Sequence, residues 1–191
     1  MTRSPKTDMT SAANGITQAE LVEAINAATH EVFSTMLNLE LTAGEVFVEK
    51  EEAAPASGVV SLIGLAGPWV GSGSLSCSAA FACRIASQFL LTEYNAISED
   101  VLDSVAELTN MIIGNVKTAL ENRLGSMGLS TPTVIYGRNF QTRSARNQEW
   151  TVVPFTLDGE RMCVQVCIAP NTDSNAQLPR PGFPVPHVLN V

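Results

Sequence analysis

The longest periodic segment of the sequence, from about Glu99 to Leu124, constrains the fold more than any other feature. Its apolar residues recur at helical spacing along one side: Val101, Val105, Leu108, Ile112, Val116 and Ala119. Ser98 is placed to cap the start of this helix and Gly125 to end it. Because only one face is apolar, the helix must lie on another layer, with its polar face turned outward.

Strand patterns occur on both sides of this helix. A first helix begins near Thr17, which has capping-box spacing to Glu20, and ends before Gly44. Between the two long helices the patterns predict three strands and a short helix: Glu45 to Glu49, Val59 to Leu65, Ser72 to Ser78 and the Ala79 to Leu91 helix. Three more strands follow: Thr133 to Tyr136, Trp150 to Leu157 and Arg161 to Ile168.

This order of elements predicts an α+β domain with two long helices and a shorter one packed on an antiparallel sheet. The order is helix-β-β-β-helix-helix-β-β-β, so the two halves are loosely alike. Asp158-Gly159 between the last two strands predicts a tight hairpin. We expect a flexible leader over residues 1–13, the domain over 14–170 and a proline-rich tail over 171–191.

Composition excludes several classes of function. The net charge of −8 opposes binding to a phosphate backbone, so nucleic acid is not expected as a partner. The sequence has no apolar run near the roughly 18 residues that a membrane span needs, which favours a cytoplasmic protein. Four cysteines without a CxxC pair, and only two histidines, predict buried free thiols and no metal site; the cysteines are Cys77, Cys83, Cys163 and Cys167.

The polar face of the long helix has an unusual composition. With about 100° per residue, Asn110 lies about 60° from Glu107, Asp103 and Gly114 lie close to Glu107, and Lys117 lies near Asn110. Glycine inside a helix costs about 1 kcal/mol relative to alanine, and here it opens space between an acid and an amide. Periodicity alone leaves open that these residues form an ordinary solvated face.

The stretch Glu107-Leu-Thr-Asn110-Met-Ile-Ile-Gly114-Asn-Val-Lys117 resembles the signature helix of the CheC/CheX/FliY chemotaxis phosphatases, and most closely the CheX-like branch. The segments 60–67, 79–91 and 131–137 also resemble that family. The resemblance covers about residues 16–168. It implies hydrolysis of the aspartyl phosphate of a CheY-type receiver domain and, as in CheX-like relatives, a homodimer formed through sheet edges.

The resemblance assigns a role to each residue of the motif. Glu107 would dock the receiver's lysine, and Asn110 would position the attacking water. Beyond the resemblance, we infer that Asp103, Gly114 and Lys117 contribute to docking the partner; the alternative for Asp103 is an acid that only complements the helix dipole. The chain itself would bind no cofactor, because the receiver supplies Mg²⁺. The alternative is a non-catalytic module that binds a receiver or serves as a scaffold, as in the flagellar switch.

The first helix carries a second copy of the same spacing, Glu23 and Asn26. Aligned on that spacing, His30 and Glu31 replace Gly114 and Asn115. We expect the imidazole of His30 to crowd an incoming pocket. The pattern therefore predicts a degenerate second site.

Overall fold

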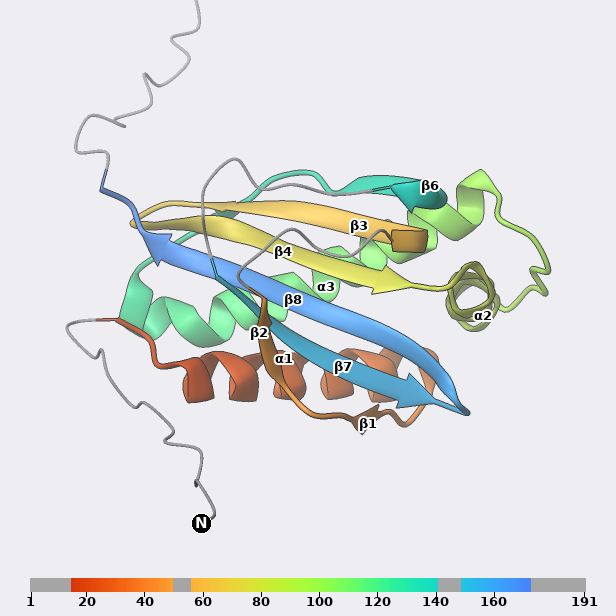
Figure 1. The fold of residues 1–191 in the computed structure, drawn as a ribbon, viewed down its shortest axis with the longest axis horizontal. Helices are drawn as coiled ribbons and strands as arrows, with labels where there is room; N and C mark the ends of the chain where they lie inside the picture. Colours follow the sequence, from red (N-terminus) through yellow and green to blue (C-terminus); the bar gives the residue numbers. More distant parts are fainter. Residues whose placement is uncertain (1–14, 50–55, 141–148, 173–191) are drawn as a thin grey trace, which may run out of the picture.

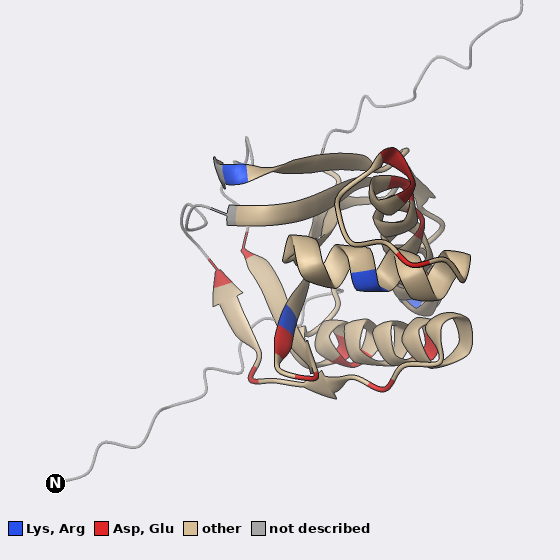
Figure 2. Cartoon of the chain, turned by 90° about the vertical axis from the view of Figure 1, so that its right-hand side faces the viewer, with Lys and Arg blue, Asp and Glu red and all other residues tan. Residues whose placement is uncertain are grey.

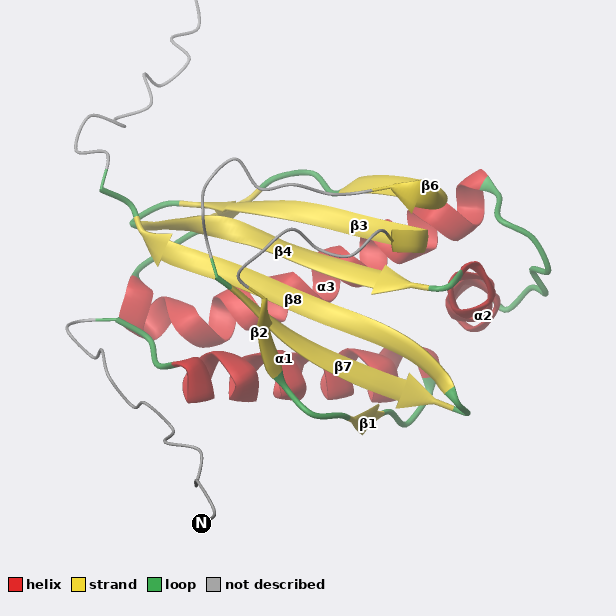
Figure 3. Cartoon of the chain, in the orientation of Figure 1, coloured by secondary structure: helices red, strands yellow, loops and turns green. Residues whose placement is uncertain are grey.

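The computed structural model describes residues 15–49, 56–140 and 149–172. They form two layers, with the sheet on one side and the two long helices on the other, and the shorter helix lies at one end of the sheet (Figures 1 and 3). The leader and almost all of the tail lie outside the described residues. This arrangement confirms the α+β class expected from the order of elements, and it leaves one face of each long helix outward.

Each helix begins at a side-chain cap. The first, α1 (Gln18–Val32), has a complete capping box between Thr17 and Glu20, and it continues through a π-helical turn, η1 (Phe33–Leu37). Ser78 caps α2 (Ala79–Leu90), and Ser98 caps α3 (Glu99–Leu124) by accepting a hydrogen bond from the Val101 amide. None of the helices in the described ranges is long and apolar enough to cross a membrane.

The sheet is antiparallel throughout and has eight strands. They are β1 (Thr42–Ala43), β2 (Phe47–Glu49), β3 (Ala56–Ala66), β4 (Trp69–Cys77), β5 (Gly128–Leu129), β6 (Thr133–Phe140), β7 (Trp150–Leu157) and β8 (Glu160–Pro170). The order is β1-β7-β8-β4-β3-β5, with β2 also on β7 and β6 also on β3. The predicted hairpin joins β7 to β8, and both Asp158 and Gly159 have positive φ.

The two halves of the chain exchange their edge strands. β1 and β2 follow α1 but pair with β7 of the second half, whereas β5 and β6 follow α3 but pair with β3 of the first half. β4 and β8 pair with each other at the centre of the sheet. The loose similarity of the halves is thus an approximate twofold arrangement, in which α1 and α3 occupy equivalent places.

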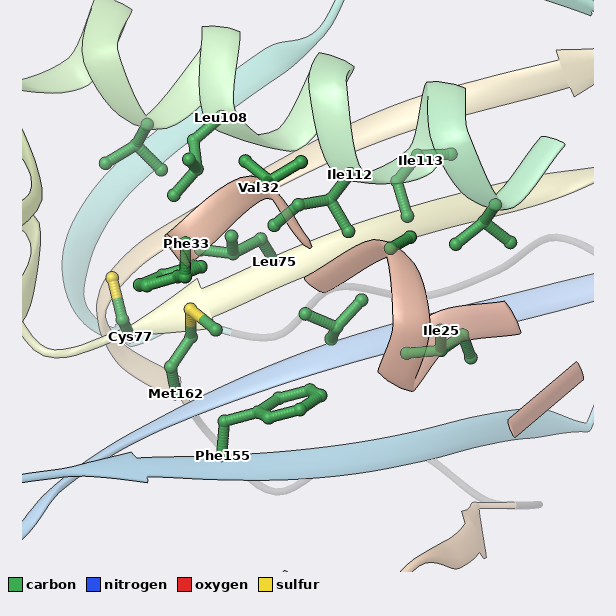
Figure 4. Close-up of a cluster of buried hydrophobic side chains, with 14 of the residues drawn as sticks. Ile25, Val32, Phe33, Leu75, Cys77, Leu108, Ile112, Ile113, Phe155 and Met162 are labelled. Atoms are coloured by element: carbon green, nitrogen blue, oxygen red, sulfur yellow. The ribbon is translucent and has the colours of Figure 1, made fainter. Parts of the chain in front are cut away.

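The core lies between the sheet and the helices. Figure 4 shows Ile25 and Val32 of α1 and Ile112 of α3 lying above Phe155 and Met162 of the sheet. All five are at most 2% exposed. Burial of apolar surface on this scale fixes the height of both long helices over the sheet, and therefore the orientation of their outer faces.

Several strands are longer than the sequence pattern indicated. β4 begins at Trp69 instead of Ser72, and both Gly71 and Gly73 lie inside the strand. A Cβ on Gly73 would come 2.7 Å from the side chain of Ile113, so glycine here lets α3 approach the sheet closely. The two-residue strands β1 and β5 were not predicted, because such short segments carry no periodicity.

Candidate functional site on helix α3

Glu107 and Asn110 lie one turn apart on the outer side of α3. Glu107 is exposed and Asn110 is half-buried. Neither side chain bonds to any residue in the described ranges, and the Asn110 amide is not among the buried polar groups that lack a partner. The carboxylate and the amide are therefore both open to water or to a partner.

Two observations show how the outer face of α3 is oriented: a hydrogen bond of Asn115 and the surroundings of Gly114. Asn115 donates a hydrogen bond to the Glu31 carboxylate of α1 over 3.4 Å, which marks the side of α3 next to α1. Asn110 lies about 140° around the helix axis from Asn115. A Cβ on Gly114 would come 3.8 Å from Leu129 of β5. Asn110 and Gly114 are therefore turned away from α1, toward the edge formed by β5 and β6.

Acidic residues surround the motif. The first half of α3 carries Glu99, Asp100, Asp103 and Glu107 and no basic residue; all described Asp and Glu positions are red in Figure 2. Asp103 is exposed. Asp100 instead accepts a hydrogen bond from the Tyr94 hydroxyl over 2.9 Å, and this bond raises the pKa of Tyr94. The surface beside Asn110 is thus negative and suited to a basic partner.

Lys117 does not lie free on this face. Its ammonium group donates to the Glu121 carboxylate over 2.8 Å, and the same carboxylate accepts from the Met127 backbone amide over 2.9 Å. The hydrogen bond from Lys117, followed by that from Met127, lowers the pKa of Glu121. These contacts tie the end of α3 to the segment that enters β5. Lys117 thereby helps to hold the segment that leads into β5, next to Gly114. Its positive charge is paired with Glu121 of the same chain.

The second motif, on α1, is arranged differently. Glu23 is exposed, but the amide oxygen of Asn26 is buried and has no hydrogen-bond partner. His30 packs edge-on against Phe155 of β7, with 5.7 Å between ring centroids, so its ring is turned toward the sheet. This placement contradicts the expectation that the imidazole would crowd an incoming pocket. The buried amide oxygen of Asn26 also offers no exposed acceptor, unlike the amide of Asn110.

The approximate twofold axis passes between the two motifs. Glu31 follows Glu23 by eight residues, as Asn115 follows Glu107, and these equivalent residues contact each other. The axis therefore lies at this contact, and each motif faces its own edge of the sheet. Sequence reasoning did not identify Glu31 or Leu129 as neighbours of the site, because both reach α3 from distant parts of the chain.

The other candidate chemical groups are structural. All four cysteines are free thiols, and burial raises the pKa of each, to about 12 for Cys77. Thiols held in the protonated form are poor nucleophiles. Within the described ranges, no group of three or more His, Cys, Asp or Glu side chains is arranged to hold a metal ion.

Comparisons with known proteins identify the family of the chain. The family model described as "Chemotaxis phosphatase CheX" matches residues 59–156. A curated relative, the "CheY-P phosphatase CheX" of Thermotoga maritima, is 29% identical over 127 residues, which span 66% of this chain and 81% of the relative. The matched region includes α3 and its motif.

Solved structures give the same result. The chemotaxis protein CheX of Vibrio vulnificus superposes with a TM-score of 0.70 and 28% identity, covering 78% of this chain and 99% of that one. The Borrelia burgdorferi structure of a CheX–CheY–BeF3–Mg²⁺ complex gives a TM-score of 0.68 and 28% identity, with 78% and 97% covered. The fold and the outward motif define a CheC/CheX-type domain. This chain belongs to the chemotaxis phosphatase CheX family.

Proposed function

We propose that this chain is a cytoplasmic phosphatase that hydrolyses the aspartyl phosphate of a CheY-type receiver domain at the outer face of α3. The observation that carries the proposal is the amide of Asn110, one turn from the carboxylate of Glu107, with neither side chain bonded to any of the described residues. The relative named CheY-P phosphatase and the related CheX–CheY complex support the choice of substrate.

In the proposed reaction, water attacks the phosphorus atom, and the bond from phosphorus to the receiver's aspartate oxygen breaks. The products are inorganic phosphate and a free aspartate carboxylate. The Asn110 amide oxygen accepts a hydrogen bond from the water. This bond orients the water so that a lone pair of the water oxygen points at the phosphorus atom. An amide is a weak base, but a loose phosphoryl-transfer transition state needs little proton removal, so orientation supplies most of the rate gain.

The receiver would supply the remaining charges. Its Mg²⁺ ion neutralises the phosphoryl oxygens, and its lysine pairs with Glu107, which sets the docking register. Asp103 adds negative charge for encounter with a basic partner, and Gly114 leaves room for the phosphorylated pocket. The ammonium group of Lys117 supports the segment before β5 through Glu121.

The direct test is a phosphoryl-hydrolysis assay. The purified chain, a phosphorylated receiver and Mg²⁺ are mixed, and phosphate release is compared with the receiver's own rate. Acceleration at substoichiometric amounts of the chain is the expected result. Tight binding of the receiver without acceleration would instead favour the non-catalytic binding or scaffold role.

Replacing Glu107 by glutamine should raise KM for the phosphorylated receiver by about tenfold and leave kcat within about twofold. A charge-assisted hydrogen bond contributes about 1.5 kcal/mol, which corresponds to that factor. Steady-state kinetics separate the two constants. The same change at Glu23 should alter neither constant, because the α1 motif is degenerate. A lower kcat with unchanged KM for Glu107→Gln would contradict the docking role.

We also propose that the chain forms a homodimer through a sheet edge. β6 is a continuous edge strand of eight residues and pairs only with β3 among the described strands. The opposite edge is divided between the short strands β1 and β2. A long open edge is the better template for pairing with another copy. Light scattering should give twice the 20.3 kDa chain mass, and the chain mass itself would contradict the proposal.

A further inference from the structure

A large aromatic side chain is exposed on β6, the edge strand that contacts α3. Tyr136 of β6 has 52% of its surface exposed. It is paired in register with Val59 of β3, which is fully buried in the core beneath the helices. Paired residues of an antiparallel sheet point to the same face. The Tyr136 ring therefore stands on the helix side of the sheet, at its open edge.

This edge borders α3 on the side toward which Asn110 is turned. β6 contacts α3, whereas α1 packs on β7 near the other edge of the sheet. Figure 1 shows β6 beside the first half of α3, the half that carries Asp103 and Glu107. Val134, two residues before Tyr136, is half-buried and packs against the core. Tyr136 thus continues the outer surface of α3 toward the sheet edge.

A receiver domain needs more contact area than the outer face of α3 alone provides. Specific interfaces bury about 800 Å² on each partner, which involves roughly 20–30 residues. The footprint must therefore extend beyond α3. Because the phosphorylated pocket has to reach Asn110 and Gly114, and both are turned toward β5 and β6, the footprint is displaced toward that edge and away from α1.

We propose that Tyr136 is a receiver-docking residue, whose ring packs against the receiver domain while the phosphoryl group lies at Asn110. The inference rests on the proposed phosphatase function. Tyrosine is favoured at interface centres, since it buries a large rigid surface and keeps a polar end. Pairing of two β6 edges would use backbone groups in the sheet plane, whereas the ring stands perpendicular to that plane and stays beside α3.

The test uses the full-length chain and a phosphorylated receiver. Tyr136→Ala should raise KM by about tenfold, the scale of an interface hot spot, with kcat within about twofold. Tyr136→Phe should retain the low KM, because the ring supplies the contact. The matched control is Phe47→Ala: Phe47 is 41% exposed on β2 at the opposite edge, and its removal should leave both constants unchanged.

Other outcomes separate this inference from the proposed function. If Tyr136→Ala has the wild-type KM while Asn110→Ala is inactive, the docking role of Tyr136 is wrong and the phosphatase proposal stands. If Asn110→Ala is as active as wild type, the proposed mechanism itself fails. A lower mass of Tyr136→Ala by light scattering would assign the ring to an interface between copies and overturn the inference.

Discussion

Asn110→Ala should reduce the acceleration of receiver dephosphorylation by at least about 100-fold, to near the receiver's own rate. The change removes the only proposed group that orients the water, and loss of one positioned group in an active site costs about this much. KM should change little, since docking depends on Glu107 and the surrounding surface. Single-turnover measurements with excess chain would separate the chemical step from docking.

The matched control for this variant is Asn122→Ala, the same substitution at an exposed position of the same helix, three turns further along. Neither variant should be less stable than the wild type, because Asn110 makes no hydrogen bond to the described residues and alanine has the higher helix propensity. Equal activity of Asn110→Ala and Asn122→Ala would remove Asn110 from the mechanism. Loss of activity in both would point to a disturbed helix.

The parts of the fold that depend on local chemistry were predictable from the sequence. The caps Thr17 and Ser98 fix where α1 and α3 begin, and the apolar stripe of α3 fixes which of its faces is buried. The outward orientation of Glu107 and Asn110 follows directly from that stripe. The identification of the site as a phosphatase motif came from family resemblance, because spacing alone fits many solvated helices.

What surrounds the site was not predictable, since it depends on pairing between distant segments. Leu129 reaches Gly114 only because β5 pairs with β3, and Glu31 meets Asn115 only because α1 lies beside α3. His30 was expected to crowd an incoming pocket, but its edge-on contact with Phe155 turns the ring toward β7. Helical angles give the direction of a side chain from the axis, but they do not show which neighbour lies there.

Gly114→Ala should increase the free energy of unfolding by about 1 kcal/mol. It should also lower kcat/KM for the phosphorylated receiver at least about tenfold, because KM rises. The stability gain follows from the helix propensity of alanine. A Cβ at this position would meet only Leu129, at 3.8 Å, which is an ordinary van der Waals contact. The fold therefore does not require glycine here, and the open space is available to a docked partner.

Denaturant unfolding and steady-state kinetics on the same variants separate the two effects. Gly73→Ala is the contrasting control, because its Cβ would overlap the side chain of the buried Ile113 and should cost about 1–3 kcal/mol of stability. In the series from alanine to valine at Gly114, activity should fall further as the side chain grows. A Gly114→Ala protein that is more stable and fully active would show that the receiver does not approach this position. One that is less stable would show that glycine serves the fold.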